Sequence, residues 1–158
     1  MSLKFLESLK SLGVKSPESL ESSESSQTVE LIDNPIDFDA LAKVNTDIYA
    51  WITIPNTKVD YPVLQSTDDS DDYYLNHTFE KKYSSAGSIY TQKINSKDFS
   101  DPNTLIYGHN MRDDSMFGKL MYFEDPAYLN EHRYFTIYNE TGEHKYEIFS
   151  AFVTFSAS

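Results

Sequence analysis

The feature that most constrains the fold is a series of short β-like runs, each followed by turn residues. Runs of four to eight residues that alternate apolar and polar side chains and stop at Pro, Asn or Gly are typical of strands. Twelve Tyr and ten Phe residues also favour pleated sheet surfaces. Pro62 lies inside one run and indicates an edge strand or a bulge there. The sequence predicts strands over residues 49–54, 59–64, 87–91, 104–107, 134–138 and 145–154.

Helical patterns are few and short. Apolar residues recur at helical spacing after Asn34-Pro35, which together are typical of a helix start. Shorter helices are expected at residues 116–121 and 126–132. Strands therefore dominate, and we predict an α+β fold that is mainly β, with short peripheral helices around a sheet or open barrel.

Composition divides the chain into three regions. Leu and Phe residues within 1–14 are spaced as in an amphipathic N-terminal helix. Residues 15–30 are rich in Ser and Glu and have few apolar anchors, so they are predicted to form a flexible linker. The folded domain is expected over residues 31–158.

Charge and cysteine content exclude several functions. The formal net charge of −12 argues against nucleic acid as a partner, because phosphate neutralisation requires clustered Lys and Arg. The 158 residues contain no Cys, which excludes disulfides, thiol catalysis and thiolate metal sites in this chain. No apolar run approaches the roughly 20 residues that span a bilayer, so the chain as written is expected to be soluble.

His109 is the strongest candidate for chemistry. It follows Gly108 at the end of a predicted strand, and an imidazole there suits acid–base work because its ordinary pKa lies near neutrality. The competing interpretation is a loop histidine that makes one hydrogen bond. The other histidines lack metal-ligand spacing, and the acidic segment 68–72 lacks the features of a calcium loop. No metal site and no cofactor are therefore expected.

Several segments together resemble one family. They are Trp51-Ile-Thr-Ile54, Thr57-Lys-Val-Asp-Tyr-Pro-Val-Leu-Gln65, Tyr74-Leu75, Gly87-Ser-Ile89, Asn103-Thr-Leu-Ile-Tyr-Gly-His-Asn110 with Ser115-Met-Phe117, and Tyr146-Glu-Ile-Phe-Ser150. In this order they are similar to the motifs of class B sortases, cysteine transpeptidases that attach surface proteins to Gram-positive cell walls. The resemblance covers residues 33–152 and implies a sortase-like β-barrel.

The resemblance also implies a reaction. In this family a cysteine thiolate attacks the Thr carbonyl of a C-terminal sorting signal and forms a thioester. An amine of the peptidoglycan cross-bridge or of its lipid-linked precursor then takes the acyl group. By motif position His109 is the catalytic general acid and base, and Leu75 helps to line the substrate groove. Asp71 lies where the family often has Asn.

The sequence departs from the family at its nucleophile. The family's Thr-Leu-Ser/Thr-Thr-Cys motif and the Arg on the strand after it do not occur, and Arg112 and Arg133 do not match that Arg. We therefore expect a C-terminally incomplete barrel without the last strands, inactive in transpeptidation as given. The final strand, near 145–155, is expected to lack a partner and to expose Tyr146, Ile148, Phe149 and Phe152.

Two other functions stay open. One is a non-catalytic surface or scaffold module that kept the sortase frame. The other is a binding domain for peptides or wall glycans. If the resemblance extends to location, the protein lies on the outer face of the cell membrane, held by an N-terminal anchor that this sequence does not contain, with residues 15–30 as a tether.

Overall fold

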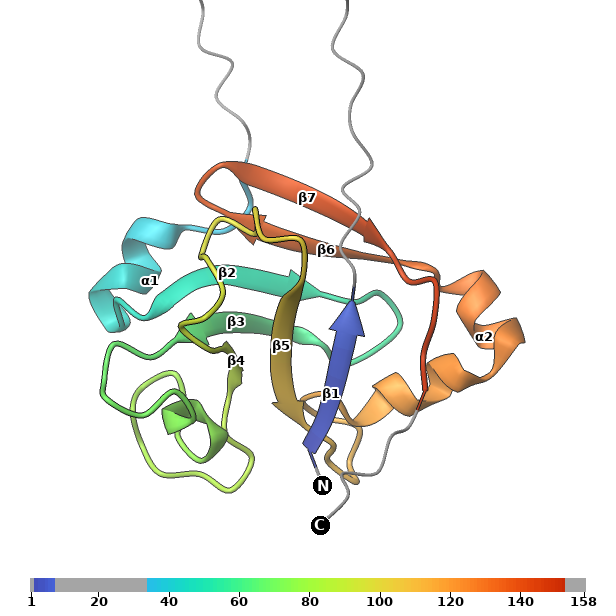
Figure 1. Ribbon diagram of the computed structural model, residues 1–158, viewed down its shortest axis with the longest axis horizontal. Coiled ribbons are helices and arrows are strands. Elements are labelled where there is room, and N and C mark those ends of the chain that lie inside the picture. Colours follow the sequence, from blue (N-terminus) through green and yellow to red (C-terminus); the bar gives the residue numbers. More distant parts are fainter. Residues whose placement is uncertain (1, 8–33, 153–158) are drawn as a thin grey trace, which may run out of the picture.

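Short strands form most of the regular structure in the computed structural model, which describes residues 2–7 and 34–152 (Figure 1). The strands are β1 (Ser2–Glu7), β2 (Ile48–Thr53), β3 (Asp60–Gln65), β4 (Ile89–Thr91), β5 (Thr104–His109), β6 (Tyr134–Asn139) and β7 (Gly142–Glu147). The helices are α1 (Phe38–Val44) and α2 (Pro126–Glu131), with 3₁₀-helices η1 (Tyr73–Leu75) and η2 (Gly118–Glu124).

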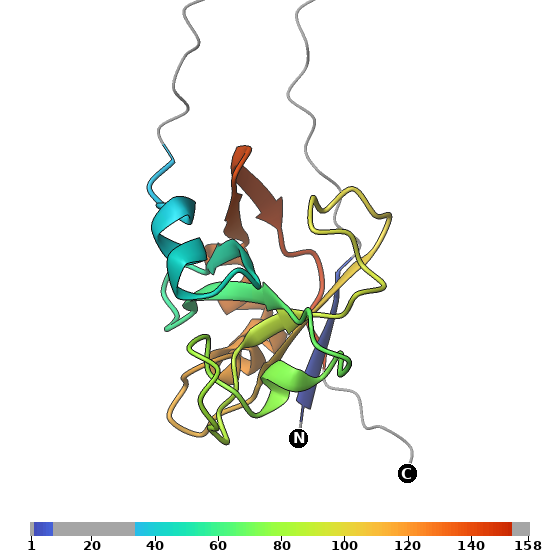
Figure 2. The same cartoon turned by 90° about the vertical axis from the view of Figure 1, so that its left-hand side faces the viewer.

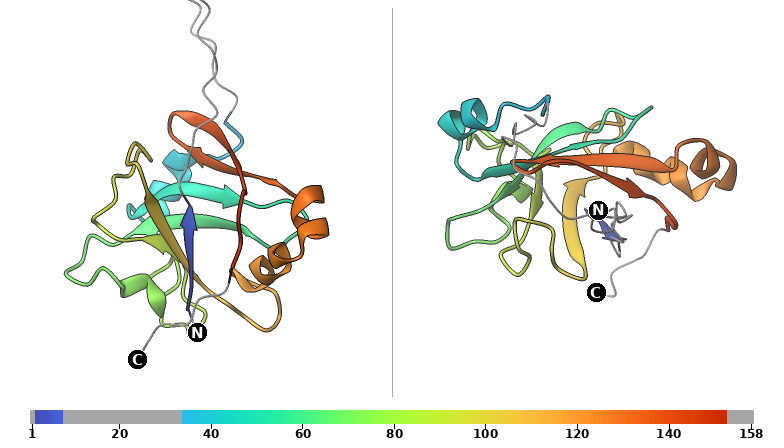
Figure 3. Two further views of the ribbon diagram at one scale, coloured as in Figure 1. Left: turned by 45° about the vertical axis from the view of Figure 1, so that its right-hand side comes forward. Right: turned by 90° about the horizontal axis from the view of Figure 1, so that it is seen from above.

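All seven strands belong to one sheet in the order β1-β5-β4-β3-β2-β6-β7. Only β3 and β4 run parallel, and every other neighbouring pair is antiparallel. The sheet curls into a half-barrel, while α1 and α2 lie at its opposite ends (Figures 1 and 3). The predicted α+β fold, mainly β with short peripheral helices, is confirmed.

The two faces of the sheet bury different residues. Ile52, Val63, Ile89 and Ile106 point into the main core inside the curl. A smaller cluster covers the outer face, where Leu64, Tyr90 and Tyr107 pack beneath η1. Neighbours along β3, β4 and β5 thus alternate between the two faces, as the period of two in a strand requires.

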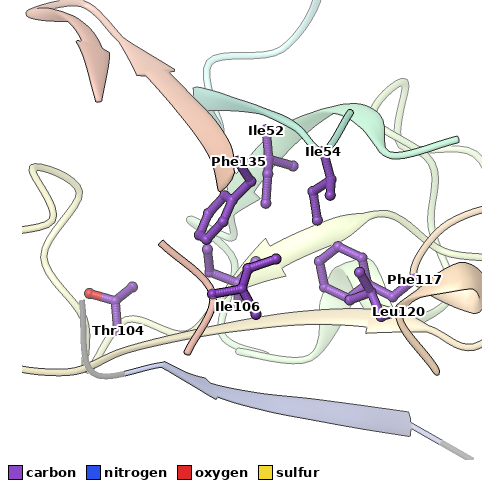
Figure 4. Close-up of a pocket in the computed structure, with 8 residues that line it drawn as sticks. Ile52, Ile54, Thr104, Ile106, Phe117, Leu120 and Phe135 are labelled. Carbon is purple, nitrogen blue, oxygen red and sulfur yellow. The ribbon is translucent and has the colours of Figure 1, made fainter. Parts of the chain in front are cut away.

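The interior of the half-barrel is almost filled (Figure 4). Apolar side chains from β2 and β6 point toward Ile106, Phe117 and Leu120 on the other side. The space left between them is about 20 Å³, which is room for one water molecule. This hollow is therefore core rather than a ligand site.

The first helix begins later than predicted. Asp37 is its N-cap, because its carboxylate accepts a hydrogen bond from the Ala40 amide at 2.9 Å. Asn34 instead donates to the Asn139 carbonyl at 2.8 Å and so ties the chain to the end of β6. The prediction of a helix start at Asn34-Pro35 was therefore wrong.

The N-terminal helix predicted over residues 1–14 is also wrong for the part that the structure describes. Ser2–Glu7 form β1, which pairs antiparallel with β5 from Ser2 opposite His109 to Glu7 opposite Thr104. The side of β5 away from β4 offers unpaired backbone groups, and pairing with them outweighs a weak helical periodicity. The predicted linker over 15–30 lies outside the described residues.

The C-terminal prediction is confirmed only in part. Phe149 and Phe152 are exposed by 62% and 57%, as expected for a segment without a partner. Tyr146 and Ile148 are buried instead, because Tyr146 stacks on Phe135 and Ile148 lines the interior hollow. β7 ends at Glu147 rather than near residue 154.

Pro62 does not mark an edge strand. It lies in β3, which has β2 on one side and β4 on the other. The pairing with β4 begins only at Val63, so Pro62 faces no β4 partner and its missing N–H costs nothing there.

Candidate active site

His109 is the last residue of β5 and is half-buried. It lies on the outer face of the sheet, because it is two residues beyond Tyr107, which packs in the outer cluster. The imidazole is thus at a strand end, outside both apolar clusters. Such a ring is accessible to a reacting group while its backbone is held in the sheet.

Gly108 is required by close packing beneath the histidine. A Cβ atom at this position would lie 2.5 Å from Ile89 Cδ1 and 2.7 Å from Phe117 Cδ2. Because Gly108 has no side chain, the core side chains Ile89 and Phe117 can pack directly against the backbone of β5 just before His109.

Gly108→Ala is expected to lower the free energy of unfolding by about 1–3 kcal/mol, because the added methyl group overpacks the core. Denaturant unfolding measures the loss. The double variant with Ile89→Val should lose less than the sum of the two single changes, since valine lacks the closest atom. Strict additivity would contradict the contact.

The turn after His109 folds back onto the strand. The Phe117 amide donates to the His109 carbonyl at 2.9 Å, and the Met116 amide donates to the Tyr61 hydroxyl at 3.1 Å. Met116 and Asp114 have positive φ angles of 51° and 64°, so the turn is tight. These bonds fix the backbone on the C-terminal side of the histidine.

The two predicted site residues lie in direct contact. His109 Nε2 is 2.7 Å from the backbone carbonyl oxygen of Leu75. Leu75 ends η1, and the green segment that carries this turn runs beside the end of β5 (Figure 2). The contact involves the main chain of Leu75 rather than the side chain that the resemblance pointed to.

A buried polar network lies behind Leu75, and sequence reasoning missed it. The Tyr74 hydroxyl donates to Asp47 Oδ2 at 2.6 Å and accepts from Asn45 Nδ2 at 2.8 Å. Lys81 Nζ is 3.3 Å from the same carboxylate oxygen. Asp47 and Tyr74 are both fully buried. A polar pair Asn45 and Asp47 just before a strand was the only sequence signal.

Asp47 stays ionised in this setting. Burial alone would raise its pKa, but hydrogen bonds from the side chains of Tyr74, Thr67 and Lys81, together with the Lys81 charge, hold the pKa below its usual value. An aspartate with a lowered pKa stabilises the fold above its unfolded-state pKa of about 3.9, and this contribution is lost as the pH falls through the folded-state value.

Asp47→Asn is expected to lower the free energy of unfolding at pH 7 by roughly 1.5–3 kcal/mol, the cost of losing hydrogen bonds to a charged group. The difference in unfolding free energy between the variant and the unchanged protein should shrink as the pH falls below the unfolded-state pKa of about 3.9 and through the lower folded-state pKa, where Asp47 becomes protonated in the folded state as well. Denaturant unfolding at several pH values measures this, with exposed Asp69→Asn as control. A gap that does not change with pH would contradict the ionised state.

A groove lies at the same end of the sheet as His109. Its volume is about 270 Å³, and its lining includes Tyr61, Pro62, Gly87, Ser88 and Met116. Met116 forms a β-bridge with Asn110, the residue after His109, and Gly87 lies against the Leu75 carbonyl. The lining is largely apolar and suits an extended peptide more than a charged ligand.

The remaining histidines hold structural contacts. His77 stacks on Tyr73 with ring centroids 4.0 Å apart, His132 Nδ1 is 2.9 Å from Asn56 Nδ2, and His144 lies against Asn139. No group of three or more potential metal ligands occurs in the part of the chain that the structure describes. Among its helices, none is long and apolar enough to cross a bilayer.

Asp71 and Arg133, which the comparison with the family motifs singled out, both have ion-pair partners. Asp71 Oδ1 lies 3.8 Å from Lys93 Nζ, and Asp72 accepts a hydrogen bond from Gln92 at 3.0 Å. Arg133 pairs with Glu147 at 3.1 Å, on the β6–β7 hairpin. Arg133 is thus engaged in a surface ion pair away from His109.

Comparison with known proteins gives the family. A Sortase domain matches residues 52–158. Sortase B of Listeria monocytogenes is 42% identical over 114 residues, and sortase B of Staphylococcus aureus is 34% identical over 117 residues. These matches cover 72% and 74% of this chain but 46% and 47% of the relatives, so the chain spans about half their length. The chain belongs to the sortase family.

Comparison with solved structures narrows the assignment of the chain within the sortase family. Sortase B from Listeria monocytogenes superposes with a TM-score of 0.63 at 41% identity, covering 72% of this chain and 64% of that one. A Staphylococcus aureus sortase B–substrate complex gives 0.64 at 32% identity, covering 72% and 51%. Its relatives and structural neighbours are class B sortases, as the sequence motifs indicated.

Proposed function

We propose that the protein is a transpeptidase of the class B sortase type, in which His109 is the general acid and base. The observation that carries the proposal is the placement of His109: the imidazole lies half-buried at a strand end, and the next residue, Asn110, forms a β-bridge with Met116 of the groove lining. The proposed partners are a sorting-signal peptide and a peptidoglycan amine, and the proposed location is the cell surface.

Proton transfer is the part of the reaction that this chain supplies. A leaving amine needs a proton as the peptide bond breaks, and an incoming amine must lose one as the new bond forms. One imidazole can serve both half-reactions, because it gives up a proton in the first and recovers it in the second. The cysteine that forms the thioester in the family is not among these 158 residues.

The chain alone is therefore expected not to cleave a fluorogenic sorting-signal peptide. Without a thiol no thioester forms, and an imidazole by itself does not replace it. The assay compares the chain with its His109→Ala variant. Cleavage that is present in the unchanged chain and absent in the variant would show that the chain needs no cysteine and would contradict the proposal.

A chimera separates the proposal from its main alternative. The alternative is a non-catalytic peptide-binding or scaffold module, which the lack of cysteine favours. Residues 1–158 are joined to the part of Listeria monocytogenes sortase B that follows the matched region. The family pattern places the cysteine there. Cleavage by the chimera supports the transpeptidase proposal, whereas peptide binding without cleavage supports the binding module.

A further inference from the structure

The nitrogen that faces Leu75 has a fixed protonation state. A backbone carbonyl can only accept hydrogen bonds, and His109 Nε2 lies 2.7 Å from this one. Nε2 must therefore carry a proton in this contact. In the neutral imidazole the other nitrogen, Nδ1, is then without a proton and holds the free lone pair.

The Leu75 carbonyl is itself held in place. Gly87 packs against it so closely that a Cβ atom there would lie 2.4 Å from the oxygen. The Leu75 amide donates to the Asp72 carbonyl at 2.9 Å, and the Ser88 amide donates to the Tyr74 carbonyl at 2.9 Å. Hydrogen bonds thus hold the backbone of both Tyr74 and Leu75, the last two residues of η1.

The buried network anchors this turn to the sheet. The Tyr74 side chain leaves η1 and ends at Asp47 Oδ2, 2.6 Å away. The Asp47 amide donates to Asn45 Oδ1 at 2.9 Å, and its carbonyl accepts from the Gln65 amide of β3 at 3.0 Å. A buried, charged acceptor is a strong and directional partner, so it fixes the Tyr74 ring and with it the Leu75 carbonyl.

We propose that Tyr74 and Asp47 are positioning residues for His109: through the Leu75 carbonyl they keep a proton on Nε2 and leave Nδ1 as the nitrogen that exchanges protons with the reacting groups. This inference rests on the acid–base role proposed above. Nδ1–H of the imidazolium gives its proton to the leaving amine, and the freed lone pair later takes a proton from the incoming amine. Nε2–H is unchanged throughout, so the proton count of the ring balances over one cycle.

The test is a long-range ¹H–¹⁵N spectrum of the full chain labelled in its histidines, recorded at about pH 8, where a free imidazole is neutral. Assignment of His109 uses its loss in His109→Gln. The expected result is one tautomer, with an Nδ1 shift typical of an unprotonated nitrogen and an Nε2 shift typical of a protonated one. A proton on Nδ1 would overturn the inference without requiring any further variant.

Two variants test the positioning itself. Tyr74→Phe removes the hydroxyl that reaches Asp47, and Gly87→Ala pushes on the Leu75 carbonyl directly. Each is expected to move both His109 nitrogen shifts toward the average of the two tautomers. The matched control is Tyr49→Phe, which removes a hydroxyl bonded to Thr91 Oγ1 at 2.7 Å and touches neither Asp72 nor Leu75.

Unchanged His109 shifts in both variants would overturn the positioning role. If Gly87→Ala fails to fold, because Gly87 has a positive φ of 58° and the added Cβ would meet backbone atoms, Tyr74→Phe and the spectrum of the unchanged chain still decide the question. The spectrum needs no catalytic turnover. An inactive chimera would therefore count against the proposed function but would not decide the tautomer of His109.

Discussion

Phe117→Ala is expected to lower the free energy of unfolding by about 3–5 kcal/mol, one of the largest effects of any single substitution in this chain. Phe117 is 2% exposed, lines the interior hollow and packs against Gly108. Its removal leaves a cavity in a core that has almost no free space, and the surrounding strands cannot close it. Denaturant unfolding followed by circular dichroism measures the loss.

The control for that experiment is Phe149→Ala. Phe149 is 62% exposed, so its truncation should change the free energy of unfolding by no more than about 0.5 kcal/mol. If the protein has less stability than Phe117→Ala removes, that variant will be unfolded in buffer while the control stays folded. Equal losses in the two variants would show that the inner face of the half-barrel is not the core.

His109→Ala in the chimera is expected to lower kcat/KM for sorting-signal cleavage by about 10²–10⁴-fold, the usual contribution of a positioned general acid and base. The loss should fall mainly on kcat, because the imidazole acts on the transition state more than on peptide binding. Steady-state cleavage of the fluorogenic peptide measures both parameters.

His132→Ala is the matched control, because His132 lies at the end of α2 and contacts Asn56 rather than the groove. It should leave kcat/KM close to that of the chimera itself. A comparable loss in both variants would indicate a general effect on folding instead of catalysis by His109.

The sheet was predictable because strand signals are local. The predicted runs 134–138 and 145–154 correspond in kind to β6 and β7, although β7 lies at Gly142–Glu147, and the run 104–107 predicted β5. Element ends were less predictable. Asp37 rather than Asn34 begins α1, because the capping hydrogen bond depends on a backbone geometry that spacing alone does not fix.

Long-range partners could not be predicted from the sequence. Nothing local in residues 2–7 indicates that they pair with β5, which is about a hundred residues away in the chain. The same applies to the contact between Leu75 and His109, and to the burial of Asp47 behind Tyr74. The sequence motifs pointed to His109 and Leu75 separately as candidates, while the contact of His109 with the Leu75 carbonyl follows from the fold.

The intact mass of the chimera after mixing with a sorting-signal peptide shows whether this chain can support formation of the acyl-enzyme. We expect a mass increase equal to the acyl part of the peptide, held as a thioester, that disappears when a peptidoglycan-type amine is added. In the His109→Ala chimera the adduct should form far more slowly. A folded chimera that binds the peptide but never gains this mass would contradict the claim that this chain carries the acid–base half of a sortase site.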